Sequence, residues 1–161
     1  MNITHHREQL KLKRKENNKF FKNLKKIKPK ILDKTIHHLH DEVFENTNCL
    51  ECSNCCKTTG PLFTDKDIIR IAKHLRIKPS IFTGKYLQID EDKDYVLKSV
   101  PCHFLEMDTY CSIYEVRPKA CREFPHTDRI RQYQLLKLTE KNVEVCPAVF
   151  SLIEKLKEII L

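Results

Sequence analysis

The chain has 161 residues, of which 40% are hydrophobic and 32% charged, with 8 Cys, 2 Gly and no Trp. The hydrophobic share is below the usual level of about 45 to 50%, so we expect one lean core plus an appendage, and a bound metal would offset the deficit. Two glycines are too few for a Gly-rich phosphate loop or a dinucleotide fingerprint, which excludes those classes of nucleotide-binding protein.

The charge of the chain is concentrated at its N-terminus. Residues 1–34 hold twelve Lys or Arg against three acids, a formal charge of +9, whereas residues 35–161 hold eighteen against nineteen, a charge of −1. We therefore predict a basic helical arm over residues 1–34 and a cysteine-cluster metal-binding domain over residues 35–161. The start has no apolar leader, and no apolar run approaches the roughly 18 residues of a membrane span. We expect a soluble, cytoplasmic protein that does not contact membranes.

Residues 4–28 are compatible with a helix that Pro29 ends or kinks, and a second amphipathic helix is predicted over residues 31–46. The basic arm has two interpretations. Its cations suit salt-sensitive contacts with nucleic-acid phosphates, and five of them are the candidates: Lys13, Arg14, Lys22, Lys25 and Lys26. Alternatively, the apolar stripe of the arm docks on the domain. We favour docking, because no base-reading motif is present.

Four of the eight cysteines lie within the eight residues from Cys49 to Cys56. The C-x2-C spacing occurs twice there, and it lets a tight turn bring two thiolates to one metal. Cys55 and Cys56 are adjacent, so their side chains diverge and one of them should face a second metal or the surroundings of the first. A disulfide between them is disfavoured, because a trans peptide sets their Cα atoms about 3.8 Å apart, below the usual disulfide range.

The rest of the chain alternates short elements around an irregular, cysteine-bearing segment. Helices are predicted over residues 65–76, 79–86 and 147–160. Strands are predicted over residues 62–63, 94–100 and 131–139, the last two as an antiparallel pair. Thr64 should cap the first of these helices, whose buried face we assign to Ile68, Ile69, Ala72 and Leu75. The predicted fold class is α+β, mainly α, with a short antiparallel hairpin and long irregular loops.

In a reducing compartment, the cysteines are better explained as metal ligands than as disulfides. The predicted ligands are Cys49, Cys52, Cys55, Cys56, Cys102, Cys111, Cys121 and Cys146. The first three, completed by a remote Cys before Pro147, follow the ferredoxin pattern for a [4Fe-4S] cluster. Paired C-x2-C knuckles equally suit structural zinc. Spacing therefore predicts zinc or iron, the latter including an iron-sulfur cluster.

At the segments Cys102-His-Phe-Leu and Cys111-Ser-Ile-Tyr-Glu-Val-Arg-Pro-Lys-Ala-Cys-Arg-Glu-Phe-Pro125, the sequence resembles the CxxCxxCC cysteine-cluster family, described as zinc- or iron-chelating (YkgJ-like). Residues 49–126 follow the family pattern, including an acid, Asp67, in the helix after the cluster. One departure is Ser53, where many members carry Gly, which bears on turn geometry. The resemblance implies a metal-binding domain.

Six residues are predicted to surround the metal: Lys57, His103, Tyr114, Arg117, Arg122 and His126. The cations among them can donate hydrogen bonds to sulfur and keep the thiolates ionised. The two histidines are also substitute ligands, although eight thiols are available. Tyr114 should pack around the site.

The favoured function is non-catalytic binding of a metal ion through thiolates, with an unknown protein partner. One alternative is a redox or methyl-transfer enzyme, or an accessory to one, that carries a [4Fe-4S] cluster, since flagellin lysine methylases have a similar cysteine cluster. The other is weak nucleic-acid binding through the basic arm.

Overall fold

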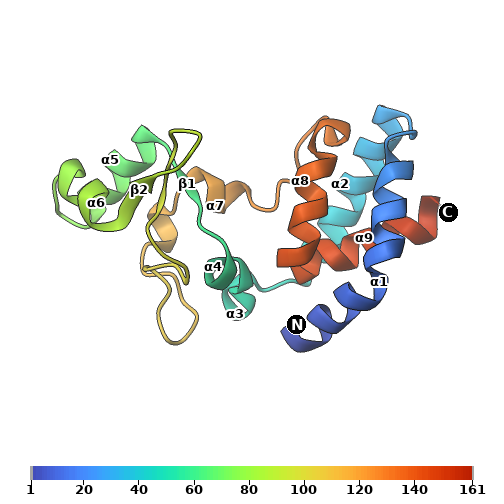
Figure 1. Ribbon diagram of the computed structural model, residues 1–161, viewed down its shortest axis with the longest axis horizontal. Helices are drawn as coiled ribbons and strands as arrows, with labels where there is room; N and C mark the ends of the chain where they lie inside the picture. Colours follow the sequence, from blue (N-terminus) through green and yellow to red (C-terminus); the bar gives the residue numbers. More distant parts are fainter. Residues whose placement is uncertain (1, 161) are drawn as a thin grey trace. The chain divides into compact units, whose positions relative to one another are not determined.

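The computed structural model describes residues 2–160 and separates into two compact units (Figure 1). Unit 1 contains the chain up to Asn48 and again from Pro125 onward, and unit 2 contains Cys49–Phe124. Each unit has its own hydrophobic core. None of the helices within residues 2–160 combines the length and the apolar character that crossing a bilayer requires.

Unit 1 is a helical bundle. Its helices are α1 (Ile3–Leu24), α2 (Pro29–Glu45), α8 (Gln132–Val145) and α9 (Pro147–Ile160). The last three pack pairwise against one another, and α1 packs on α8 and α9. Pro29 and Pro147 occupy the first positions of their helices, where the missing N–H costs no hydrogen bond. Leu32, Ile36 and Leu152 are fully buried in the shared core.

The first helix of the basic N-terminal segment belongs to this bundle. Phe20, Phe21 and Leu24 on α1 are buried in the core of unit 1. Lys157 on α9 is only 5% exposed and donates to Glu16 Oε1 at 2.5 Å and to Asn17 Oδ1 at 2.6 Å. Docking of the apolar stripe on the other helices, the favoured interpretation of this segment, is therefore confirmed.

The predicted strand over residues 131–139 is wrong, because Arg131 is the N-cap of helix α8 and the rest of the segment lies in that helix. Its buried residues Gln132, Leu136, Thr139 and Val143 recur at intervals of four, three and four, which places them on one face of a helix. The Asp33 carboxylate on α2 accepts the backbone N–H of Gln132 at 2.8 Å and so satisfies a donor in the first turn. Packing against α2 and α9 overrides the local alternation that suggested a strand.

Unit 2 contains short elements joined by irregular loops. Its elements are α3 (Cys49–Cys52), α4 (Asn54–Thr58), β1 (Leu62–Phe63), α5 (Asp65–His74), α6 (Pro79–Tyr86), β2 (Leu87–Ile89), β3 (Tyr95–Leu97), the 3-10 helix η1 (Tyr114–Val116) and α7 (Lys119–Glu123). The strands form one antiparallel sheet in the order β1-β3-β2, with Leu62 opposite Val96 and Gln88 opposite Val96 from the other side. The predicted fold class, mainly α with a small antiparallel sheet, is confirmed.

Helix α5 begins as the sequence predicted. Thr64 and Asp67 form a capping box, in which each side chain accepts from the other residue's backbone N–H. Ile68, Ile71 and Ala72 face the core of unit 2. The assignment of Ile69 to the buried face is wrong: Ile69 is 59% exposed, because the buried stripe continues from Ile68 at +3 and +4.

Candidate metal centre

Two short helices carry the cluster of four cysteines. Helix α3 ends at Cys52, and α4 begins at Asn54. Between them Ser53 has a left-handed backbone, with φ 44° and ψ 17°. This conformation explains why glycine suits the position, since only glycine adopts it without a Cβ clash. The Ser53 hydroxyl is buried and has no hydrogen-bond partner within residues 2–160.

The irregular segment that carries Cys102 and Cys111 is bonded to these helices. The backbone N–H of Cys102 donates to the carbonyl oxygen of Cys56 at 2.7 Å. Farther along, Leu105 and Cys111 pair across an isolated antiparallel bridge. The Thr109 hydroxyl donates to the Leu50 carbonyl oxygen at 2.7 Å. These hydrogen bonds hold the segment that carries Cys102 and Cys111 against helices α3 and α4, and Cys56 lies in α4.

Cys121 lies on α7, and an ion pair on α5 holds the start of that helix. The Asp67 carboxylate is 1% exposed and accepts both the Lys119 backbone N–H at 3.1 Å and the Arg70 guanidinium at 2.6 Å. Arg70 also donates to the Arg117 carbonyl oxygen at 2.9 Å. Burial alone would raise the pKa of Asp67, but hydrogen bonds from Thr64, Arg70 and Lys119 keep it below the ordinary value.

The sequence alone does not indicate these hydrogen bonds, which link Asp67 and Arg70 on α5 to Lys119 and Arg117. The sequence placed Asp67 in the helix after the cysteine cluster, but Lys119, which donates to its carboxylate, and Arg117, whose carbonyl oxygen accepts from Arg70, lie about fifty residues away in the chain. The D-x-x-R spacing of Asp67 and Arg70 on α5 is the one local signal that could have suggested them.

Four of the thiols form a mutually interacting set. They are Cys56, Cys102, Cys111 and Cys121, and each lies close enough to the other three for negative charge on one to raise the pKa of the next. Burial is the larger cause for Cys102, whose pKa is raised to about 11, and for Cys121, whose pKa is raised to about 12. All four are free thiols of intermediate exposure. The fold therefore places thiols from four separate segments of unit 2 within electrostatic range of one another.

The other cysteines of the turn adjoin this set. A hydrogen bond with the Cys55 thiol, followed by burial, raises the pKa of Cys56. The pKa of Cys49 is raised by burial and then by charge on Cys52 and Cys56. Cys146 belongs to unit 1, where its N–H donates to the Asn142 carbonyl oxygen at 2.7 Å and its side chain packs against the core.

Arg117 is a cation whose charge acts on several of the thiols. Its positive charge acts to lower the pKa of Cys49, Cys111 and Cys121, against the larger effect of burial. The guanidinium lies over the Tyr114 ring, 3.9 Å from its centroid, and donates to the Tyr114 carbonyl oxygen at 2.7 Å. Tyr114 therefore sets the position of the charge that Arg117 presents to the cysteines.

The remaining residues predicted around the metal lie in different parts of the two units. Lys57 follows Cys56, and its charge acts to lower the pKa of that thiol. His103 packs against the Tyr86 ring at 4.7 Å between centroids. Arg122 is exposed in the last turn of α7. His126 belongs to unit 1, where its carbonyl oxygen accepts from Gln132.

The donor set suits a thiophilic cation. Thiolates are the preferred ligands of zinc and of iron-sulfur clusters, and a bound cation would offset the burial and the smaller repulsion that raise the pKa values of the thiols. Among the side chains of residues 2–160, no three from His, Cys, Asp or Glu stand in an arrangement that would hold a metal ion. In this arrangement the thiols influence one another's charge without forming a coordination site.

The candidate phosphate-binding cations lie on and after α1. Lys13 forms an ion pair with Glu154 on α9, which occupies its charge within unit 1. Arg14, Lys22, Lys25 and Lys26 are exposed.

Residues 48–147 match the family described as "CxxCxxCC: Putative zinc- or iron-chelating domain". The match covers more than half of the chain, and the chain belongs to this family. The resemblance found in the cysteine segments is thereby confirmed, and the family supports binding of zinc or iron.

Among curated proteins, the uncharacterized protein MJ0661 of Methanocaldococcus jannaschii is 34% identical over 91 residues. The aligned part covers 55% of this chain and 49% of that protein, so the chain spans about half the length of this relative. No solved structure gives a significant match.

Proposed function

We propose that the protein binds zinc or iron without catalysing a reaction, through a four-thiolate centre made of Cys56, Cys102, Cys111 and Cys121. Two observations carry this proposal: the backbone N–H of Cys102 donates to the carbonyl oxygen of Cys56 at 2.7 Å, and negative charge on these four thiols, which come from four segments of unit 2, raises the pKa of the others. Cys49, Cys52 and Cys55, on the same turn, supply a second group of ligands. Their spacing allows this group to take a second ion or to pass metal to the centre.

The charge balance of the centre supports a thiolate-held cation. Four thiolates around Zn²⁺, or around a [4Fe-4S]²⁺ cluster, leave a net charge of −2, which Arg117 is placed to offset. Because the thiols must lose their protons on binding, metal uptake releases protons and weakens as the pH falls.

The test is anaerobic purification followed by elemental analysis of the wild type and of single Cys→Ser variants. We expect each of Cys56→Ser, Cys102→Ser, Cys111→Ser and Cys121→Ser to lose the same ion, while Cys146→Ser retains it. Loss of that ion in Cys146→Ser to the same extent would contradict the four-thiolate centre and favour the ferredoxin-like set. Wild-type protein with neither zinc nor iron would contradict metal binding altogether.

The same samples distinguish holding a metal from redox chemistry. A colourless protein with stoichiometric zinc would remove the iron-sulfur alternative. A brown protein with visible absorbance that bleaches on reduction would favour it.

A further inference from the structure

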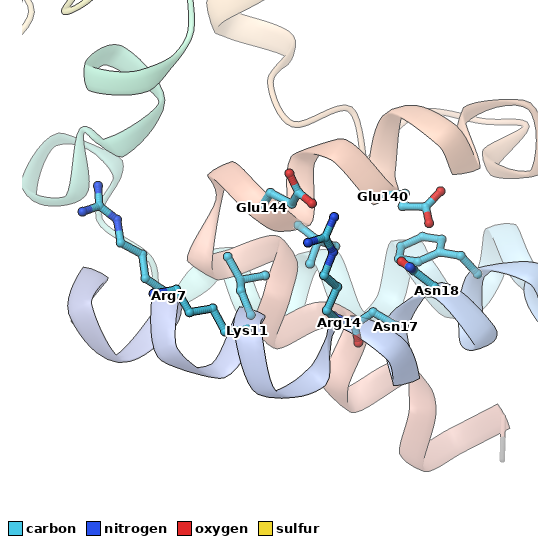
Figure 2. A pocket seen from close by; sticks show the side chains of 10 residues that line it. Arg7, Lys11, Arg14, Asn17, Asn18, Glu140 and Glu144 are labelled. Carbon is cyan, nitrogen blue, oxygen red and sulfur yellow. The ribbon is translucent and has the colours of Figure 1, made fainter.

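A groove lies on the surface of unit 1 between α1 and α8 (Figure 2). Its cavity volume is about 450 Å³. Pockets that bind small molecules usually measure about 300 to 1,000 Å³, so the groove is large enough for a compact ligand. Its apolar lining consists of Leu10, Phe21 and Val143, which belong to or pack against the core of unit 1.

One wall of the groove is a row of cations on α1. Arg7, Lys11 and Arg14 line it at i, i+4 and i+7, so they follow one another along about 10 Å of the helix axis. In the part of the chain that the structure describes, none of the three forms an ion pair with a carboxylate. By contrast, Lys13 on the same helix is paired with Glu154. The cations of the groove are therefore available to a ligand.

The opposite wall has the opposite charge. Glu140 and Glu144 on α8 line the groove across from the cations, with Asn17 and Asn18 contributed by α1 (Figure 2). A ligand that is anionic throughout would place negative charge against these two carboxylates. A ligand that is anionic at one end and carries hydroxyl or amino groups at the other satisfies both walls, because carboxylates accept hydrogen bonds from such groups.

We propose that this groove binds a nucleotide unit, with its phosphate on Arg7, Lys11 and Arg14 and its sugar hydroxyl or base amino groups on Glu140 and Glu144. Recognition of this kind uses side chains of two helices and requires no Gly-rich loop. The unit is either a free nucleotide or part of a single strand of RNA or DNA. The proposal stands apart from metal binding, since every lining residue belongs to unit 1.

The test compares two variants of the full chain that lose the same charge. Arg7→Gln/Lys11→Gln/Arg14→Gln removes the groove cations, and Lys15→Gln/Lys19→Gln/Lys22→Gln removes three exposed cations of α1 with the same spacing outside the groove. Binding of AMP is measured by calorimetry, and binding of a fluorescent single-stranded 12-mer by anisotropy. We expect the groove variant to lose about tenfold or more in affinity and the control about threefold or less. The reason is that the cations of the groove contact phosphate directly, whereas the cations removed in the control do not.

Equal losses in the two variants would overturn the proposal, since they would indicate nonspecific attraction by the net charge of α1. Absence of binding of both probes to the wild type would also overturn it. Binding of AMP that displaces the 12-mer assigns the free nucleotide and the strand to the same groove. Binding of the 12-mer alone, with the loss confined to the groove variant, assigns the site to the strand.

A second variant tests the acidic wall. Glu140→Gln/Glu144→Gln removes the repulsion of phosphate and weakens acceptors of hydroxyl and amino hydrogen bonds. The preference for AMP over inorganic pyrophosphate should therefore shrink severalfold. An unchanged preference would exclude a role of these glutamates in recognition and contradict the orientation of the ligand.

Discussion

At the scale of single residues, Ser53 shows how the backbone of the cysteine turn limits its sequence. A left-handed conformation costs a residue with a Cβ about 1 to 2 kcal/mol, and Ser53 adopts it at φ 44°. Its hydroxyl is also buried without a partner in the described chain. Both features are unfavourable for folding, and both would be absent with glycine.

We predict that Ser53→Gly stabilises the metal-free protein by up to about 1 kcal/mol, because relief of the left-handed backbone exceeds the entropy that glycine loses on folding. Urea denaturation in the presence of a chelator measures the free energy of unfolding. Ser80→Gly, in the first turn of helix α6, is the control and should destabilise slightly, because glycine loses more entropy on folding and relieves no left-handed backbone there. A lower free energy of unfolding for Ser53→Gly would show that the hydroxyl contributes more than the backbone costs.

At the scale of elements, α5 is the part of unit 2 that positions Cys121. Asp67 connects the first turn of α5 to the N-terminus of α7, and Arg70 connects α5 to the carbonyl of Arg117. Helix α7 has only five residues, too few to be stable alone. Its position therefore depends on the buried carboxylate.

We predict that Asp67→Asn lowers the free energy of unfolding at pH 7 by about 1.5 to 3 kcal/mol, the usual value of hydrogen bonds to a charged group. The folded-state pKa of Asp67 lies below that of the unfolded chain, which is about 3.9. Its stabilisation is thus complete above the unfolded pKa and disappears as the pH falls through the folded pKa.

Urea unfolding between pH 7 and pH 2.5 should accordingly show a constant difference between wild type and Asp67→Asn above about pH 5, and a shrinking one below about pH 4. Asp65→Asn is the control: this exposed acid in the same first turn should change stability by about 0.5 kcal/mol. A difference between wild type and Asp67→Asn that is independent of pH would exclude the charge of Asp67 as the cause.

At the scale of the whole molecule, the two units differ in what stabilises them. Unit 1 has long helices packed around a continuous apolar core. Unit 2 has a smaller core, and its cysteines lie on short helices and irregular loops. A metal that cross-links those loops would contribute its binding free energy to the folding of unit 2.

We predict that removal of metal with a chelator raises amide hydrogen exchange in residues 49–124 and leaves the protection of α2 and α9 unchanged. At a metal concentration a hundred times the Kd, binding stabilises the folded state by about 2.7 kcal/mol, so exchange through unfolding should quicken about a hundredfold. Mass spectrometry of peptides locates the change.

Cys121→Ser is the control for this experiment. Its amide hydrogens in the segments around Cys102 and Cys111 should exchange quickly whether or not chelator is present. If chelation affected both units equally, they would unfold together. If the variant responded to chelator as the wild type does, Cys121 would not be a ligand.

Prediction from sequence succeeded where structure depends on neighbouring residues. Thr64 and the acids after it indicated the start of α5, and Cys146 before Pro147 indicated the start of α9. It failed over residues 131–139, because the face that is buried in α8 is chosen by α2 and α9. The hydrogen bond from Lys119 to Asp67 could not be predicted either, since it joins two residues that are far apart in the chain and share no local pattern.

The sequence by itself determined the cysteine spacing, the family, the position of the excess charge and the ends of most helices, because each depends on residue type and short spacing. The tertiary structure alone decided that Cys56 neighbours Cys102, Cys111 and Cys121, that Cys146 belongs to the other unit, and that cations of α1 face acids of α8. Such contacts join residues far apart in the chain. They form when packed helices and loop hydrogen bonds offset the entropy of closing the chain between them.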